Sequence, residues 1–237
     1  MLTATRLVLL MLLSAASLLS AAEDKKSGPP EITVPKLTQA APKIDGTLDD
    51  AAWKDAAKST PLVRTYGEAS SLQCTFRILQ DDKNLYIAVD CPETDSGIKA
   101  LKLDVTEHDG DPIWDDDCIE LFIDPSGKRD FPYYQIIINP KSVTFDVQMN
   151  GNGDPDKGWD PKYEAKAQIG KSGWTAEFAL PFAMFDRTEK SADEWTFNLA
   201  HSRSAGEALY WAPVHDESSH QPAKFGKLKG IAVRALK

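Results

Sequence analysis

The stretch Thr144-Phe145-Asp146-Val147-Gln148-Met149 alternates apolar and polar residues with a period of two. A strand points successive side chains to opposite faces of a sheet, so this pattern is typical of a half-buried strand. The same alternation recurs over residues 163–169 and over residues 174–180. Between these segments, residues 150–155 and 170–173 are rich in the Gly, Asn and Pro that turns prefer. The repetition predicts antiparallel β structure.

Helical patterns are scarce in the rest of the chain. Residues 48–57 and 182–185 predict short helical turns. Many short strands separated by turns predict an all-β fold, an antiparallel β-sandwich with polar faces turned outward. On such a fold, a concave sheet or its loops can hold a ligand.

The first 22 residues differ in composition from the remainder of the chain. They carry one charge, Arg6, then a leucine-rich run over residues 7–13 and small residues up to Ala22. This is the pattern of a secretory signal, and its apolar run is shorter than the ~20 residues that a membrane-spanning helix needs. We therefore expect residues 1–22 to be a signal peptide. The mature protein would begin near Glu23 and be exported, to the periplasm or outside the cell, without membrane insertion.

Residues 23–41 are rich in Lys, Pro and Ser and predict a linker that ends as an edge strand at residues 32–34. Residues 42–237 then form one domain, long enough to bury a core. Loss of Arg6 leaves 26 basic and 36 acidic residues, a formal charge of −10. Such a surface repels nucleic acid and anionic membranes and suits neutral ligands or metal ions.

The three cysteines lie in predicted strands. Residues 74–80 and 85–91 flank a turn, and a simple hairpin register places Cys74 opposite Cys91. The pair is either a cross-strand disulfide or two small buried residues, and both interpretations stay open. Cys118 is expected to be a free thiol in the core.

An acidic turn with one tryptophan runs into a strand that carries a glutamate: Trp114-Asp115-Asp116-Asp117-Cys118-Ile119-Glu120-Leu121-Phe122-Ile123-Asp124. An indole face packs against the apolar C–H face of a pyranose, and a nearby carboxylate accepts hydrogen bonds from its hydroxyls. A strand holds both groups rigidly. The stretch therefore indicates a sugar site.

Four stretches, residues 44–53, 114–124, 209–213 and 225–228, resemble in this order the family 9 carbohydrate-binding modules and their bacterial relatives. The resemblance implies a jelly-roll-like β-sandwich that clamps a sugar ring between two tryptophans. It implies that Trp114 and Trp211 form the clamp and that the Glu120 carboxylate accepts hydrogen bonds from the sugar. It also implies that Asn198 or Arg203 makes further hydrogen bonds to the sugar.

The chain departs from the family at two places. On the central strand, residues 134–139, Ile137 stands where a sugar-binding member can present an arginine. After the late strand, residues 195–200, His201 stands where relatives often place an arginine. The recognition of sugar hydroxyl groups is therefore either altered or lost in this chain. The resemblance is a stronger basis for inferring the fold than for inferring the ligand.

The other tryptophans are expected to be structural. Trp53, Trp174 and Trp195 lie in apolar-periodic contexts typical of a core, and Trp159 is expected to pack at the start of a strand. By contrast, Trp114 and Trp211 adjoin polar or proline-containing loops, which favours a ligand role.

Acidic residues crowd the loop around Trp114. Asp109, Asp111 and Asp115 offer hard oxygen ligands of the kind that calcium prefers, and the family resemblance also implies structural calcium. The spacing does not match an EF-hand, and the alternative is a solvated acidic turn.

The sequence has no Gly-x-Ser-x-Gly, His-Glu-x-x-His or phosphate-loop motif. We therefore expect no enzymatic activity, and the leading hypothesis is a non-catalytic exported module that binds a poly- or oligosaccharide. Related sandwiches bind haem and carry electrons, which makes Met149, Met184 and His201 candidate axial ligands in an alternative without covalent attachment. A third hypothesis is a structural domain that has lost the sugar pocket.

Overall fold

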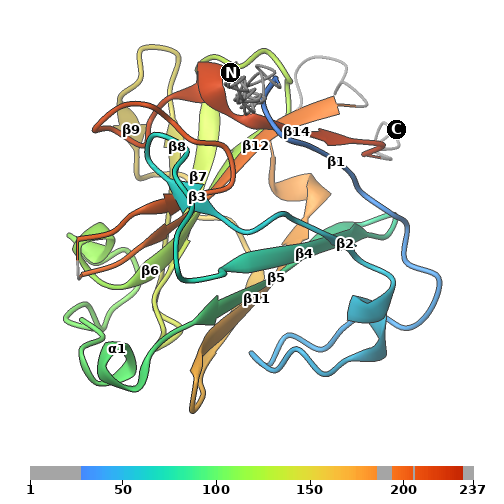
Figure 1. Cartoon of the computed structure of the whole chain (residues 1–237). Helices are drawn as coiled ribbons and strands as arrows, with labels where there is room; N and C mark the ends of the chain where they lie inside the picture. Colours follow the sequence, from blue (N-terminus) through green and yellow to red (C-terminus); the bar gives the residue numbers. More distant parts are fainter. Residues whose placement is uncertain (1–27, 186–193, 205, 232–237) are drawn as a thin grey trace, which may run out of the picture.

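The computed structural model describes residues 28–185, 194–204 and 206–231, which form two packed β-sheets (Figure 1). The strands are β1 (Glu31–Thr33), β2 (Ala57–Lys58), β3 (Val63–Arg64), β4 (Thr75–Gln80), β5 (Asn84–Pro92), β6 (Cys118–Asp124), β7 (Tyr133–Ile138), β8 (Thr144–Met149), β9 (Pro155–Asp156), β10 (Glu164–Ile169), β11 (Gly173–Pro181), β12 (Glu194–Ser202), β13 (Leu209–Tyr210) and β14 (Gly226–Lys229). The helical elements are α1 (Asp95–Lys99) and the 3-10 turns η1 (Ala51–Lys54), η2 (Ile113–Asp115), η3 (Phe182–Met184) and η4 (Pro222–Lys224).

The larger sheet has the strand order β1-β14-β12-β6-β7-β8-β9, with β13 pairing to β12 and β3 pairing to β13. The smaller sheet has the order β10-β11-β5-β4-β2. All pairs are antiparallel except β1 with β14, which run parallel. The predicted all-β antiparallel sandwich is confirmed, and the three alternating segments form β8, β10 and β11.

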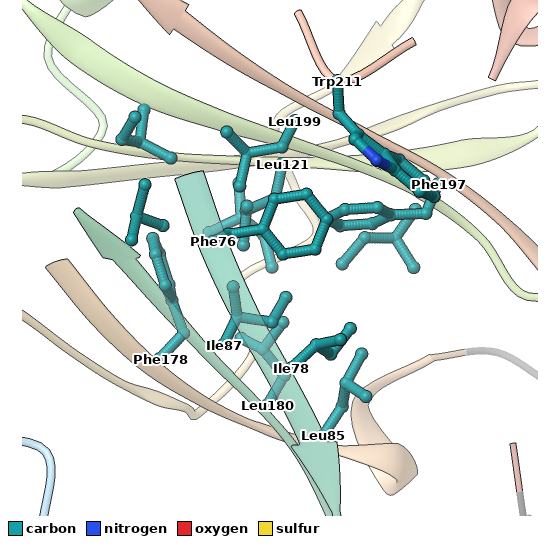
Figure 2. Packing of buried hydrophobic residues seen from close by; sticks show 14 of the residues in the cluster. Phe76, Ile78, Leu85, Ile87, Leu121, Phe178, Leu180, Phe197, Leu199 and Trp211 are labelled. Atoms are coloured by element: carbon teal, nitrogen blue, oxygen red, sulfur yellow. The ribbon is translucent and has the colours of Figure 1, made fainter. Parts of the chain in front are cut away.

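The main core lies between the sheets, as Figure 2 shows. Phe76 of β4 contacts Phe197 of β12 edge to face, with ring centroids 5.6 Å apart. Ile78, Leu85, Ile87, Phe178 and Leu180 line the core from the smaller sheet, and Leu121 and Leu199 line it from the larger one. Burying such side chains contributes roughly 1.5–3 kcal/mol each, so this layer holds the sheets together.

The outer face of the larger sheet carries a second apolar cluster, contrary to the expectation of outward polar faces. Every residue of β6 is buried, because its alternate side chains pack either between the sheets or beneath the loops outside. The outer cluster includes Phe122, Tyr133, Phe145, Val147 and Phe225. Strand β10, at the edge of the smaller sheet, does alternate between half-buried and exposed residues.

The outer face of the smaller sheet is covered by the segment that contains η1. The Glu177 carboxylate on β11 accepts hydrogen bonds from the backbone N–H of Gly46 and from the Trp53 indole N–H, both at 2.8 Å. Trp53, Trp174 and Trp195 are buried, as predicted. The predicted helical turns appear as η1 and η3, whereas α1 was not predicted from the sequence.

The segment predicted as a linker does end in an edge strand. Strand β1 pairs with β14, and the Leu37 N–H donates to the Gln80 carbonyl at 2.6 Å. The predicted signal peptide, residues 1–22, lies outside the described residues, and the domain boundary at residue 42 stays a prediction. Within the described ranges, every helix is too short or too polar to cross a bilayer.

Candidate functional site

The strand register decides which side chains face outward from the larger sheet. Glu120 pairs with Ile137, Gln135 pairs with Val147, and the side chains of these four residues share the outer face. Their strand neighbours point between the sheets. The outer face is therefore a largely apolar floor that carries one carboxylate and one carboxamide.

Loops close around part of this floor and form a pocket of about 490 Å³. Clefts of this size are typical of small-molecule sites. The pocket is lined by Trp114, Glu120, Gln135, Phe145, Val147, Met149, Pro155, Lys157, Glu217, Ser218, Ser219 and His220.

Trp114 lies at the rim of the pocket with 45% of its surface exposed. It sits in η2, which is anchored by the buried Ile113. Its ring meets Phe145 edge to face, with centroids 5.8 Å apart at 82°. An indole fixed at its edge with exposed surface elsewhere can receive a sugar ring.

Glu120 supplies the buried carboxylate of the pocket. Its Oε1 accepts a hydrogen bond from the Ser202 hydroxyl at 2.6 Å, and its Oε2 accepts one from the Gln135 amide at 2.8 Å. Burial raises the pKa of Glu120, and the two hydrogen bonds act in the opposite direction. The two contacts hold the carboxylate in one orientation.

Two further polar residues of the pocket come from loops. The His220 ring nitrogen Nδ1 is hydrogen-bonded to the Tyr133 hydroxyl, and burial lowers the pKa of His220, so the imidazole is neutral near neutral pH. Lys157 is paired with Asp111, and its ammonium lies 5.5 Å from the centroid of the Phe145 ring. A neutral imidazole and an ammonium can both hydrogen-bond hydroxyl groups.

The predicted pairing of Trp114 with Trp211 is wrong in its geometry. Trp211 is only 3% exposed and packs between the sheets beside Phe76 and Phe197 (Figure 2). Its ring centroid lies 5.4 Å from that of Phe76 and 5.8 Å from that of Phe197. The register explains this position. Tyr210 pairs with Ala200 on the outer face, so the next residue, Trp211, points inward. The two indoles therefore lie on opposite faces of the larger sheet.

The other two predicted hydrogen-bonding residues serve the fold. The buried Asn198 side chain binds both the N–H and the carbonyl of Ala212, at 2.9 Å each, and anchors the chain after β13. Arg203 makes a two-pronged ion pair with Glu93, at 2.6 and 2.9 Å. Neither residue lines the pocket around Trp114.

The structure does not bring the three predicted calcium ligands together. Asp111 pairs with Lys157, and Asp115 lies in η2. Asp109 instead groups with His108 and Asp146. The acidic turn itself is explained in part by Asp116, whose carboxylate accepts hydrogen bonds from the N–H groups of residues 104 and 105.

The haem alternative gains no support. Met149 lies on the outer face, in the pocket, whereas His201 is buried between the sheets beside Trp174. Met184 packs against the inter-sheet core. Met149 and His201 thus face opposite sides of one sheet and cannot ligate a common iron.

Sequence reasoning missed several pocket residues, including Gln135 and Lys157. Gln135 had a usable signal, because a polar residue with apolar neighbours on a strand marks an outward position. Lys157 and His220 lie on loops, where no periodicity reports direction. Trp159, expected to pack at a strand start, lies instead in the loop between β9 and β10, where it is half-buried and packs against Tyr134 with ring centroids 4.6 Å apart.

A family model for carbohydrate family 9 binding domain-like proteins matches residues 44–230 of this chain. Among curated proteins, the endo-1,4-beta-xylanase A of Thermotoga neapolitana is 21% identical over 194 residues. That match covers 80% of this chain but only 17% of the xylanase, so it concerns a small part of a much longer protein.

Solved structures share the fold. A candidate carbohydrate-binding protein of Bacteroides uniformis superposes with a TM-score of 0.67 at 17% identity, covering 85% of this chain and 99% of that one. A family 9 carbohydrate-binding module of Caldicellulosiruptor kristjanssonii, in complex with glucose, gives a TM-score of 0.56 at 16% identity and covers 87% and 98%. A family 9 module of the same organism, in complex with cellotriose, gives a TM-score of 0.57 at 18% identity, covering 87% of this chain and 99% of that one.

Proposed function

Because this chain belongs to the carbohydrate family 9 binding domain-like family, we propose that it binds carbohydrate, without catalysis, in the pocket beside Trp114. The observation that carries the proposal is the exposed indole of Trp114 at the rim of a pocket whose floor holds the oriented Glu120 carboxylate. A sugar ring needs both an apolar platform and fixed hydrogen-bonding groups.

In this proposal a single tryptophan replaces the two-tryptophan clamp. The ring of the sugar stacks on Trp114, and its hydroxyls bind the Glu120 carboxylate, the Gln135 amide and the His220 imidazole. The loop of residues 217–220 lines part of the pocket, where the end of an oligosaccharide would bind. A neutral ligand suits the acidic surface of the protein.

A competing function is a structural or assembly domain that has lost its sugar pocket. Two observations favour it: Trp211 is committed to the core, and Ile137 packs into the outer apolar cluster where relatives can present an arginine. The same binding experiment decides between the two functions.

The experiment is a glycan-array screen of the purified chain, followed by calorimetry with its best ligand and with glucose and cellotriose. We expect saturable binding that Trp114→Ala weakens by roughly 1 to 3 kcal/mol, about five- to 150-fold in Kd, because most of the aromatic contact area is lost. Tyr66→Ala is the matched control, since Tyr66 is 58% exposed and lies outside the pocket. Absence of binding to every glycan would leave the structural function.

We also propose that the protein is exported, serving polysaccharide uptake or a partner enzyme. The support is the signal-like sequence of residues 1–22. Mass spectrometry of protein from the exported fraction should find an N-terminus near Glu23. An intact Met1 there would contradict the proposal.

Structural calcium is proposed at a site that differs from the predicted one. Asp109 and Asp146 lie together, and the buried Oδ1 of Asp146 has no hydrogen-bond partner among the described residues. Burial raises the pKa of Asp146 to about 6, because the Tyr163 hydrogen bond and the nearby His108 imidazole offset the cost of burying the charge only in part. An oxygen-binding cation would offset the rest and occupy the unpaired Oδ1.

A further inference from the structure

A cluster of three metal-ligating side chains lies between the two sheets, on the opposite side of the larger sheet from the pocket. Cys74 directly precedes β4, Cys91 lies on β5, and His201 lies on β12. All three are fully buried, and their potential ligand atoms lie within 4.8 Å of one another. The cluster therefore joins the two sheets.

The two cysteines face each other as predicted, because the register that pairs Thr75 with Asp90 brings Cys74 opposite Cys91. Both thiols are free, and their sulfur atoms are 3.6 Å apart. A disulfide requires ~2.05 Å. Two sulfurs bound to one tetrahedral ion, each at ~2.3 Å from it, lie about 3.8 Å apart. The observed separation is therefore close to that of two ligands of one ion.

His201 provides independent evidence for a missing partner. Neither of its ring nitrogens has a hydrogen-bond partner among the described residues, although the side chain is completely buried. Buried polar groups in native proteins are nearly always paired, since an unpaired one costs about 1–3 kcal/mol. The ring of Trp174, 5.7 Å away, covers the imidazole without satisfying it.

Thiolate, not thiol, is the form of cysteine that binds metals, so an ion entering this cluster would displace the thiol protons.

We propose that Cys74, Cys91 and His201 bind a soft d10 cation, Zn²⁺ or Cu⁺, between the two sheets. Thiolate and imidazole ligands select these ions, whereas calcium and magnesium prefer oxygen. Two thiolates neutralise Zn²⁺, which removes the net charge from a buried site. With three protein ligands, Zn²⁺ keeps its fourth position open. The ion would link the sheets and load as the chain folds.

The experiment uses the full chain, reduced and freed of metal, with Zn²⁺ in one arm and Cu⁺ in the other. After desalting, elemental analysis should find a single bound ion per chain in at least one arm, together with a raised thermal midpoint. Cys91→Ser and His201→Gln should weaken metal binding by more than about tenfold. Cys118→Ser is the matched control, because Cys118 is buried on the outer face of the larger sheet.

Three results would overturn the proposal. The first is folded wild-type protein that retains neither metal, and the second is undiminished binding by both variants. The third is a Cys74–Cys91 disulfide in protein isolated from the exported fraction, shown by peptide mapping without reductant. If the variants do not fold, Co²⁺ added to the wild type decides, since thiolate ligation produces a charge-transfer absorption. Trp114→Ala should keep the metal, which separates this site from the sugar pocket.

Discussion

Among single residues, Glu120 is both buried and part of the proposed sugar site. It stands on a strand whose residues are all buried, and only Ser202 and Gln135 donate hydrogen bonds to its carboxylate among the described residues. Desolvation raises its pKa, so the ionised form is less stable in the folded protein than in the unfolded chain. A protein keeps such a group at a cost in stability, and the proposed recognition of a hydroxylated ligand would account for that cost.

Glu120→Gln tests this cost. The pKa of Glu120 is higher in the folded protein than in the unfolded chain. The neutral carboxyl therefore makes its full contribution to stability at a pH below the unfolded-state pKa, and this contribution is lost as the pH rises through the folded-state pKa. The free energy of unfolding of the variant minus that of the wild type should therefore grow with pH. Denaturant unfolding between about pH 4 and about pH 8 measures it.

The same variant should bind sugar at least about fivefold more weakly, because a carboxamide accepts weaker hydrogen bonds than a carboxylate. Glu217→Gln, which alters an exposed glutamate of the same pocket, is the control and should leave stability unchanged. A difference in unfolding free energy that does not vary with pH would contradict the interpretation of Glu120.

Among the elements, β13 and β14 determine where the Trp211 side chain lies. The pairing of Tyr210 in β13 with Ala200 in β12 places Tyr210 on the outer face, so the next residue, Trp211, points between the sheets. Strand β14, which also pairs with β12, packs against the indole. A Cβ atom at Gly226 would lie 2.4 Å from the Trp211 ring and 2.8 Å from the Pro30 carbonyl. The glycine is therefore required by close packing against Trp211, whereas its neighbour Phe225 belongs to the outer cluster.

Gly226→Ala should destabilise the protein by roughly 1–3 kcal/mol, the range for overpacking a close-packed interior. Urea unfolding measures the loss, and sugar affinity should change little because the pocket lies on the other face. Gly151→Ala is the control, since a Cβ there meets no atom within 4 Å. Equal stabilities for the two variants would show that Trp211 is not confined.

In the whole molecule, two apolar layers share the larger sheet. The inner layer joins the sheets, and the outer layer supports the pocket. Loops close that pocket from one side: residues 105–117 carry Trp114, and residues 211–225 carry His220. Ions that fix these loops would stabilise the pocket together with the fold.

Chelation tests the proposed calcium at Asp109 and Asp146. Removing an ion held at 100 times its Kd costs about 2.7 kcal/mol, so the thermal midpoint should fall by roughly 5–10 °C. Calcium should restore the midpoint, whereas zinc should not, which distinguishes this ion from one at the cysteine cluster. An unchanged midpoint after exhaustive chelation, with no metal by elemental analysis, would remove calcium from the protein.

The sequence by itself determined the fold class and the local pairing. Side-chain alternation is a local property of strands, so residues 144–149 predicted β8, and the short turn after residue 80 predicted the facing cysteines. The position of Trp114 beside Glu120 was likewise local, because η2 leads directly into β6.

Only the tertiary structure decided which face each distant residue occupies. A shift of one residue in strand register moves a side chain to the other face of a sheet, and no local pattern reports the pairing of β13 with β12. Trp211 therefore lies in the core, and Asn198 holds a loop. The pocket beside Trp114 is instead completed by Lys157 and His220, because long-range packing places their loops there.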